Sequence, residues 1–371
     1  MKSFRNIVVY PSQELLRHLS GGAFFRGGPD WPFFRTQIYA RHCWKLLPRP
    51  VDSRPYPSDH LVETADRGVW CGPVSNHFGH MIADFGMRIM ASSQLDMATP
   101  LVFSLWDTAG AEPPPFFWQI IDHFAIDRRR IMLVRRPTGF RRLDVVPQAE
   151  RRFGGGPSRR HLEAMDAIAS PAPPGDGDIA CAFVSRARWP MGRFAGESYF
   201  DQAFAAAGMA VFHPEKVDLQ TQLQFYRRAR RLIFSEGSAV HALQLMGHID
   251  AEIVVLARRP RSHMAAASLR PRARSVRYIQ ASRGVIYGLT ASGRPQEPSG
   301  VSVLHESSFI AGLRSIGVDI TPYWDWQRYN ERRDVEIAAW TAHRLVSQKH
   351  PGERAMIANR LKALSLQHLT P

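Results

Sequence analysis

Residues 179–257 alternate short apolar runs with amphipathic segments, and this alternation constrains the fold more than any other feature of the chain. Apolar runs of strand length, separated by segments of helix length, are typical of an open parallel sheet. We expect strands at 179–185, 210–213, 231–234 and 253–257, and helices at 197–207, 219–230 and 239–247. Such sheets bind ligands where strands end and helices begin. The turns after residues 185 and 234 are therefore candidate binding sites.

The chain before residue 170 carries strand and helix candidates of the same kind. We expect strands at 6–10, 68–73, 101–106, 131–134 and 143–146, and helices at 79–94, 116–124 and 158–169. Residues 170–178 hold three prolines, two glycines and no large apolar side chain, which is typical of a linker. Asp218 is the expected N-cap of one helix and Gly208 the expected stop of another.

The predicted fold class is α/β, with two Rossmann-like lobes, an interlobe cleft and a C-terminal helical tail. The expected units are an N-terminal lobe (1–169), the linker, a C-terminal lobe (179–325) and the tail (326–371), with a break at Pro351-Gly352. A late hairpin is expected from residues 278–279 and 285–287. A cleft between lobes is a suitable place to join two substrates.

The 371-residue chain carries 48 Lys and Arg against 33 Asp and Glu, a formal charge of +15. This excess favours anionic partners such as nucleotide phosphates, nucleic acid or an acidic membrane surface, although the base composition of the genome explains a high arginine content equally well. The three cysteines form no CxxC pair, which favours a reducing compartment. No apolar run of about 18 residues occurs, and the apolar run near the N-terminus is too short for a signal peptide. We expect a cytoplasmic protein, with peripheral contact at the inner face of an anionic membrane as an option.

The first candidate motif is the turn at residues 235–241, between an apolar run and an apolar helix. Gly237 lets the backbone approach a ligand closely, and the backbone of Gly237, Ser238 and Ala239 at the helix start suits a diphosphate. Glu236 and His241 are placed to contact the sugar or nucleoside. The alternative is an ordinary turn, since Gly and Ser are good turn residues and the motif lacks a full GxGxxG pattern.

The second motif is Ser185-Arg186, directly after an expected strand. A guanidinium group at the end of a strand suits a pyrophosphate, because arginine binds phosphate bidentately. The alternative is a solvated loop.

The third motif is the segment from Asn76 to Arg88. A helix that begins near Gly79 would place His80 and Asp84 at i and i+4 on one face, with Arg88 one turn further. A carboxylate beside an imidazole orients it as a general base. Asn76 and His77 would lie over the helix start, and both, together with Arg88, are expected on the acceptor side. A structural Asn cap and a metal site are the alternatives, but no fourth ligand is evident and no metal is expected.

In their order and spacing, these segments resemble glycosyltransferase family 61, the DUF563-like enzymes, over roughly residues 68–257. The resemblance rests on an Asn-x-x-Gly-His helix start, a Ser-Arg strand end, an acid opening the next helix, a Gln-rich helix and a Gly-Ser turn. These features correspond here to Asn76, Gly79, His80 and Asp84; Ser185-Arg186; Glu197; residues 222–229; and residues 237–241. Glu236 and His241 depart from the family wording, which commonly has His and Asn at these places.

The resemblance implies a GT-B-like fold and an inverting, metal-independent sugar transfer. It also implies that the C-terminal lobe holds the nucleotide sugar and the N-terminal lobe the glycan acceptor. Bacterial relatives are associated with capsule and surface-polysaccharide synthesis. No cofactor is expected beyond the nucleotide sugar itself, which is a co-substrate.

The leading functional hypothesis is therefore an inverting glycosyltransferase. His80 is the expected base, with Asp84 orienting it or acting directly. One alternative is a non-catalytic α/β binding or scaffold protein of an envelope-polysaccharide complex. Another is a basic nucleic-acid-binding protein, although no nucleic-acid-binding module is present and no nucleic-acid partner is expected.

Overall fold

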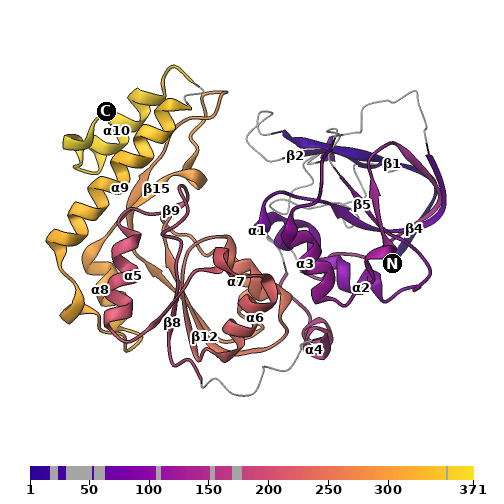
Figure 1. Ribbon diagram of the computed structural model, residues 1–371, viewed down its shortest axis with the longest axis horizontal. Helices are drawn as coiled ribbons and strands as arrows, with labels where there is room; N and C mark the ends of the chain where they lie inside the picture. Colours follow the sequence, from indigo (N-terminus) through magenta and orange to yellow (C-terminus); the bar gives the residue numbers. More distant parts are fainter. Residues whose placement is uncertain are drawn as a thin grey trace.

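A computed structural model describes residues 1–16, 24–30, 52–53, 63–105, 110–150, 155–168, 178–347 and 350–371. The protein is a mixed α/β structure with one large sheet in each half of the chain (Figure 1). We call residues 1–150 the N-terminal half and residues 155–371 the C-terminal half. Most of the predicted linker lies outside the described residues.

The N-terminal sheet has seven strands in the order β3-β2-β1-β7-β4-β5-β6. Every pairing within the run β7-β4-β5-β6 is parallel. β1 pairs antiparallel with both of its neighbours, β2 and β7. The strands are β1 (Lys2–Leu16), β2 (Phe24–Pro29), β3 (Asp52–Ser53), β4 (Glu63–Pro73), β5 (Leu101–Ser104), β6 (Ile131–Val134) and β7 (Thr138–Val145). This sheet is therefore mixed, which differs from the Rossmann-like lobe predicted for this half.

The C-terminal half contains a five-stranded sheet in the order β10-β8-β11-β12-β13, and every pairing in it is parallel. Its strands are β8 (Ala182–Val184), β10 (Ala210–Phe212), β11 (Arg231–Ser235), β12 (Ile249–Ala257) and β13 (Ala273–Gln280). The predicted alternation of residues 179–257 is confirmed here. If the five strands are numbered in chain order, their order in the sheet is 2-1-3-4-5. The second strand is added on one side of β8 and all later strands on the other, so the strand order reverses between β8 and β11.

A small third sheet joins the C-terminal tail to this half. It has the order β14-β15-β9, formed by β14 (Ser282–Ile286), β15 (Val301–Leu304) and β9 (Arg193–Phe194). The predicted late hairpin is wrong, because β13 pairs with β12 and β14 pairs with β15. The tail is helical, with α9 (Trp326–Val346) and α10 (Glu353–Ala363) interrupted near Pro351-Gly352 as predicted.

Two predicted helix boundaries are confirmed by their capping geometry. Asp218 accepts a hydrogen bond from the backbone N–H of Thr221 and caps α6 (Leu219–Arg228). Gly208 follows α5 (Glu197–Ala206) with a positive φ of 78°, the left-handed conformation that glycine adopts without strain.

The two halves are joined by apolar packing. One buried cluster contains side chains of both halves, among them Ile82 and Phe117 from the first and Val240 and Leu243 from the second. The contacts run between α1 (Phe78–His80) and the 3₁₀ helix η5 (Ser238–Leu245), and between α3 (Pro115–His123) and α6 (Figure 1). Within the C-terminal half, α4 (Arg159–Ile168) is held to the rest of that half, since Asp166 accepts hydrogen bonds from His248.

A buried polar network crosses the same junction. Glu150, at the end of the N-terminal half, pairs with Arg272 of the C-terminal half, and both side chains are fully buried. The amide of Gln244 donates to the other oxygen of Glu150 over 3.1 Å. Because an unpaired buried charge is costly, these partners tie the halves together at this point.

Candidate functional site

The predicted donor motifs lie where the parallel sheet reverses its strand order. Ser185-Arg186 follows β8 and Glu236-Gly237 follows β11, and these two strands are hydrogen-bonded neighbours. The carboxyl ends of neighbouring parallel strands meet at one edge, and the reversal point of such a sheet is where its crevice forms. The structure therefore brings together two motifs that are about 50 residues apart in the sequence.

Arg186 and Gly237 are in direct contact at this edge. A Cβ on Gly237 would overlap the Arg186 guanidinium, whereas the φ of 173° at Gly237 is extended backbone open to any residue. Gly237 is thus required by the close approach of Arg186 rather than by its backbone angle. Nε of Arg186 donates to the carbonyl of Gly192 over 2.9 Å, and burial lowers the pKa of Arg186 while the Glu197 carboxylate opposes this effect.

Glu197 fixes the loop that carries Arg186. Its carboxylate is buried and accepts hydrogen bonds from the backbone N–H of Arg186, over 2.7 Å, and of Phe194, over 3.0 Å. Desolvation raises the pKa of Glu197, although these hydrogen bonds oppose the shift. The acid that opens α5 therefore holds the backbone around the site.

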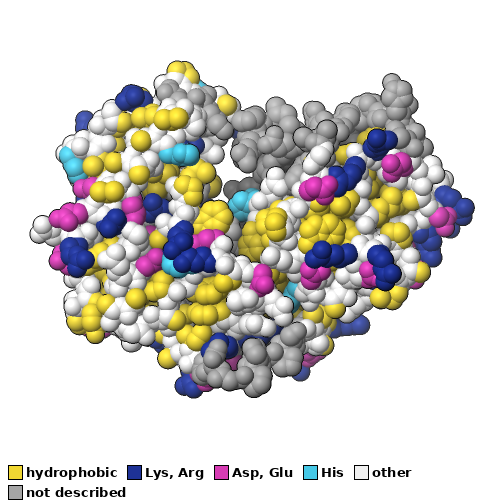
Figure 2. All heavy atoms as spheres, viewed as in Figure 1, with side chains coloured by type: hydrophobic (Ala, Val, Ile, Leu, Met, Phe, Trp, Pro, Cys, Tyr) yellow, Lys and Arg dark blue, Asp and Glu magenta, His cyan; other side chains and the backbone are white. Residues whose placement is uncertain are grey.

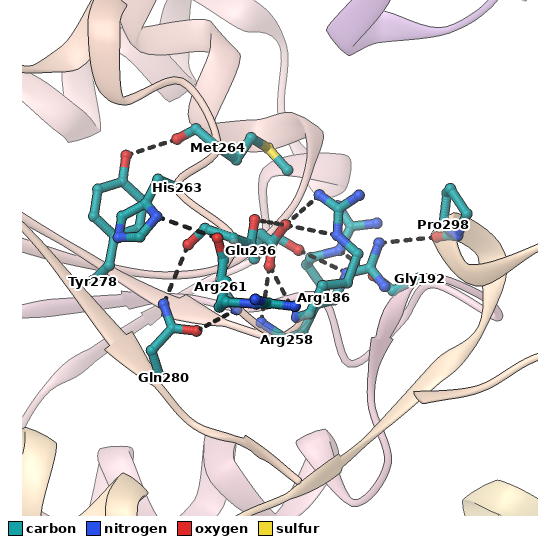
Figure 3. Close-up of polar contacts among 12 residues, drawn as sticks. Arg186, Gly192, Glu236, Arg258, Arg261, His263, Met264, Tyr278, Gln280 and Pro298 are labelled. Carbon is teal, nitrogen blue, oxygen red and sulfur yellow. Dashed lines mark hydrogen bonds and ion pairs between the residues drawn. The ribbon is translucent and has the colours of Figure 1, made fainter. Parts of the chain in front are cut away.

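Glu236 is buried among the residues of the loop that follows β12. Its side chain is fully buried, and its carboxylate accepts hydrogen bonds from the backbone N–H of Arg258, the guanidinium of Arg259 and the hydroxyl of Ser262 (Figure 3). Burial alone would raise the pKa of Glu236, but Arg259 and Arg258 hold it below its ordinary value. Glu236 therefore anchors the loop after β12, and its predicted contact with the sugar or nucleoside stays a prediction.

The predicted His80–Asp84 pair is present in the N-terminal half. Nδ1 of His80 and Oδ2 of Asp84 are hydrogen-bonded, and the two side chains are 19% and 16% exposed. The segment is less regular than predicted, because α1 continues as a π-helical turn (Met81–Phe85) and a 3₁₀ turn (Gly86–Arg88) before α2 (Ile89–Ser93). Irregular helical turns of this kind are frequent at functional sites.

Neighbouring side chains support this irregular segment. The amide of Gln148 donates to the backbone carbonyls of Asp84, over 3.1 Å, and Phe85, over 3.0 Å. At the helix start, the His77 ring accepts a hydrogen bond from the N–H of His80 and is the N-cap. Asn76 was the alternative candidate for the N-cap, but its side chain is exposed next to His77.

Arg88 lies apart from the His80–Asp84 pair. Its side chain is fully buried, and it lies near enough to Cys71 to act on that thiol electrostatically. The predicted acceptor-side role assumed a regular helix, in which Arg88 would follow Asp84 on one face. The π-helical and 3₁₀ turns change that spacing, and Arg88 points into the core.

The donor and acceptor motifs meet at Gly79. A Cβ on Gly79 would lie 3.1 Å from Cδ2 of His241 and 3.2 Å from Oγ of Ser238. Ser238 is partly exposed and follows Gly237, and Ala239 is buried. A chain of contacts thus leads from the His80 helix through Gly79 and Ser238 to Gly237 and Arg186.

His241 is part of the junction rather than of an open site. It is 4% exposed, and its Nδ1 is hydrogen-bonded to Oε1 of Gln244 over 2.7 Å. Gln244 in turn donates to Glu150. His241 therefore links α1 to the buried network between the halves, and its predicted contact with the donor stays a prediction.

Sequence reasoning missed Arg258 as a site residue. It directly follows β12, the next strand along from β11, so it shares the edge with Arg186 and Gly237. The signal was present, because an apolar run ends in Arg258-Arg259, as another ends in Ser185-Arg186.

The described residues also form a pocket that lies away from the carboxyl edge of the parallel sheet. This pocket of about 650 Å³ is lined by residues of α8 (Glu306–Arg314), Thr321, Trp324 and Trp326, and none of the predicted site residues lines it. No group of His, Cys, Asp and Glu within the described ranges is placed to hold a metal ion. None of the described helices is both long enough and apolar enough to cross a membrane. In the view of Figure 2, acidic side chains are interspersed with the basic ones.

No protein-family model matches the chain, and no curated protein matches it. Among solved structures, the chain is similar to the dodecameric iron-containing heptosyltransferase TibC in complex with ADP-D-β-D-heptose, with a TM-score of 0.27 and 13% sequence identity. The similarity covers 53% of this chain and 60% of TibC, less than two thirds of that protein.

Proposed function

We propose that the protein is a glycosyltransferase that moves a sugar from a nucleotide-sugar donor to a hydroxyl of a glycan acceptor. The observation that carries the proposal is the chain of contacts from the His80–Asp84 pair to Arg186. It joins a group that can accept a proton to a group that can hold a phosphate. A GT-B-like arrangement, membership of glycosyltransferase family 61 and a surface-polysaccharide acceptor are parts of this proposal that rest on the sequence motifs.

The proposed chemistry is a single displacement with inversion. Nε2 of His80 accepts the proton of the acceptor hydroxyl while the acceptor oxygen bonds to the anomeric carbon. Asp84, bonded to Nδ1, orients the ring and stabilises the imidazolium that forms. The bond between the anomeric carbon and the diphosphate oxygen breaks, and the electron pair leaves with the nucleoside diphosphate.

The leaving group acquires negative charge that the C-terminal half has to stabilise. The guanidinium of Arg186 and the backbone N–H groups at the start of η5 supply positive charge at the carboxyl edge of the sheet. The transfer proposed here uses no metal ion, because these groups hold the diphosphate.

A transfer assay tests the proposal directly. The purified protein is incubated with UDP-, GDP-, ADP- and CMP-sugars and a mixture of glycan acceptors, and released nucleotide and sugar-labelled product are measured. We expect one donor class to give product and Arg186→Ala to reduce turnover about 100- to 1,000-fold, the usual cost of removing a group that stabilises developing charge. Arg283→Ala, at an exposed position on β14, is the matched control. Absence of both transfer and thermal stabilisation with every donor overturns the proposal.

A further inference from the structure

Arg258 shares the carboxyl edge of the parallel sheet with Arg186. β8, β11 and β12 are consecutive in the sheet, and Arg186, Gly237 and Arg258 follow these three strands. Figure 3 shows Arg186 and Arg258 on the same side of the sheet, around Glu236. The edge therefore carries two arginines, although only one was predicted from the sequence.

The two guanidinium groups lie side by side over Gly192. A Cβ on Gly192 would lie 3.5 Å from Nη2 of Arg186 and 3.5 Å from Nη2 of Arg258. Gly192 also has a positive φ of 69°, and a Cβ there would lie 3.0 Å from the carbonyl oxygen of Pro298, so both its backbone and its surroundings disfavour a side chain. The glycine leaves room between the two cations.

Arg258 is buried without a full set of partners. It is 4% exposed, its Nε donates to the carbonyl of Glu236 over 3.2 Å, and its Nη2 donates to the carbonyl of Pro298 over 2.9 Å. Nη1 is buried and finds no hydrogen-bond acceptor within the described part of the chain. Burying a charged donor without an acceptor is costly, so such an atom suggests that a ligand supplies one.

Glu197 and Glu236 act electrostatically on both arginines, but within the described residues the printed guanidinium hydrogen bonds of Arg186 and Arg258 go to backbone carbonyl groups. Glu236 is ion-paired with Arg259, and Glu197 accepts hydrogen bonds from backbone N–H groups. Burial lowers the pKa of Arg258 to about 10, with the Glu236 carboxylate opposing this shift and Arg259 and Arg186 adding to it. Guanidinium groups keep their charge in proteins at neutral pH. Two adjacent cations of this kind favour a ligand with several negative charges.

We propose that Arg186 and Arg258 form a two-arginine clamp for the two phosphates of a nucleoside diphosphate, with Nη1 of Arg258 donating to one of them. This inference rests on the proposed function and names the ligand chemistry of that site. One guanidinium fork matches one phosphate group, so two adjacent forks match a diphosphate better than a single phosphate. The bordering segment 187–192 exposes Trp189 and Met191 to solvent.

Isothermal titration calorimetry with inorganic pyrophosphate, orthophosphate, UDP and CMP tests the clamp. We expect the wild type to bind pyrophosphate and UDP more tightly than orthophosphate and CMP. Arg258→Gln is expected to weaken pyrophosphate binding about 10- to 100-fold, the usual effect of losing a charged hydrogen bond. Arg261→Gln removes the same charge three residues further on, at an exposed position, and is expected to leave the affinity unchanged.

Arg258→Lys keeps the charge and is measured beside Arg258→Gln, with circular dichroism to check that each variant folds. Because lysine lacks the guanidinium fork, we expect the Arg258→Lys variant to bind pyrophosphate about tenfold more weakly than the wild type. This variant tests the clamp even if Arg258→Gln does not fold. Equal affinities in the wild type and the folded Arg258 variants, or no pyrophosphate binding by the wild type, overturn the clamp. If pyrophosphate binding depends on Arg258 but no nucleotide sugar is a substrate, the proposed function fails and the clamp stands.

Discussion

Gly79 lies against the imidazole of His241, at the point where the helix after β4 meets the 3₁₀ helix after β11. A residue of the acceptor motif thus contacts a residue of the donor motif across the junction of the two halves. The spacing is tight, because a Cβ on Gly79 would be 3.1 Å from the His241 ring and 3.3 Å from the His77 ring.

We therefore expect Gly79→Ala to loosen the junction. Overpacking of this kind costs about 1–3 kcal/mol, and the better helix propensity of alanine returns at most about 1 kcal/mol. The expected net loss in the free energy of unfolding is about 1 kcal/mol, measured by urea denaturation, together with a fall in transfer rate. Gly155→Ala, where a Cβ meets nothing within 4 Å, is the control. If Gly79→Ala changed neither the free energy of unfolding nor the transfer rate, the side chains around Gly79 would make room for a methyl group at no cost.

The second prediction concerns the His80–Asp84 pair. His80→Ala and Asp84→Asn should each reduce kcat about 100- to 10,000-fold with little change in the KM for the donor, because general-base catalysis contributes that much. His368 and Asp334 form another His–Asp contact, at 3.1 Å, on the exposed tail. His368→Ala is thus a matched control and should retain the parental rate. If both site variants transferred sugar at the parental rate, His80 would not be the base.

The order of elements in the C-terminal half could be read from the sequence because each strand there is a compact apolar run. Gly237 and Arg186 were correctly placed at strand ends, since the strand–helix alternation alone fixes which residues lie at the carboxyl edge. The His80–Asp84 contact was equally local, because four residues of helix bring the two side chains together.

The parts that were missed depend on partners far away in the sequence. β1 pairs with β7 in a register that joins Lys2 to Val145, and no local pattern indicates this. The ion pair of Glu236 was missed because its partner Arg259 lies beyond the next strand, 23 residues away. The contacts of His241 were missed for the same reason, since Gln244 and Glu150 enclose it only in the folded chain.

The third prediction follows from the structural role of Glu236. Glu236→Gln leaves the Arg259 guanidinium without its counter-charge, and breaking a buried pair in this way costs about 3–5 kcal/mol. We expect a lower free energy of unfolding in urea and an unchanged ratio of kcat/KM between two nucleotide sugars. Glu63→Gln, at an exposed position of β4, controls for the lost charge. A changed sugar preference at unchanged stability would support Glu236 as a donor contact.

The last prediction concerns Asp201, which lies 3.5 Å from His213 beside the carboxyl ends of β8 and β10. Burial raises the pKa of Asp201 from its ordinary value of 3.8 to about 7, helped by the nearby Glu197 and Glu215 carboxylates and opposed by a hydrogen bond from Ser185. Burial also lowers the pKa of His213, so the imidazole is largely neutral near pH 7 and gives little charge compensation.

Between about pH 4 and pH 7 the native state therefore binds more protons at Asp201 than the unfolded state does. The free energy of unfolding must fall as the pH rises through this window, and the loss is complete above the native pKa. Asp201→Asn removes the titration, so relative to the wild type it should gain on the order of 2–4 kcal/mol between pH 4 and pH 8. Urea denaturation at a series of pH values measures this difference, with the exposed Asp250→Asn as the control. Parallel pH profiles for the wild type and Asp201→Asn would contradict the assignment of the raised pKa to Asp201.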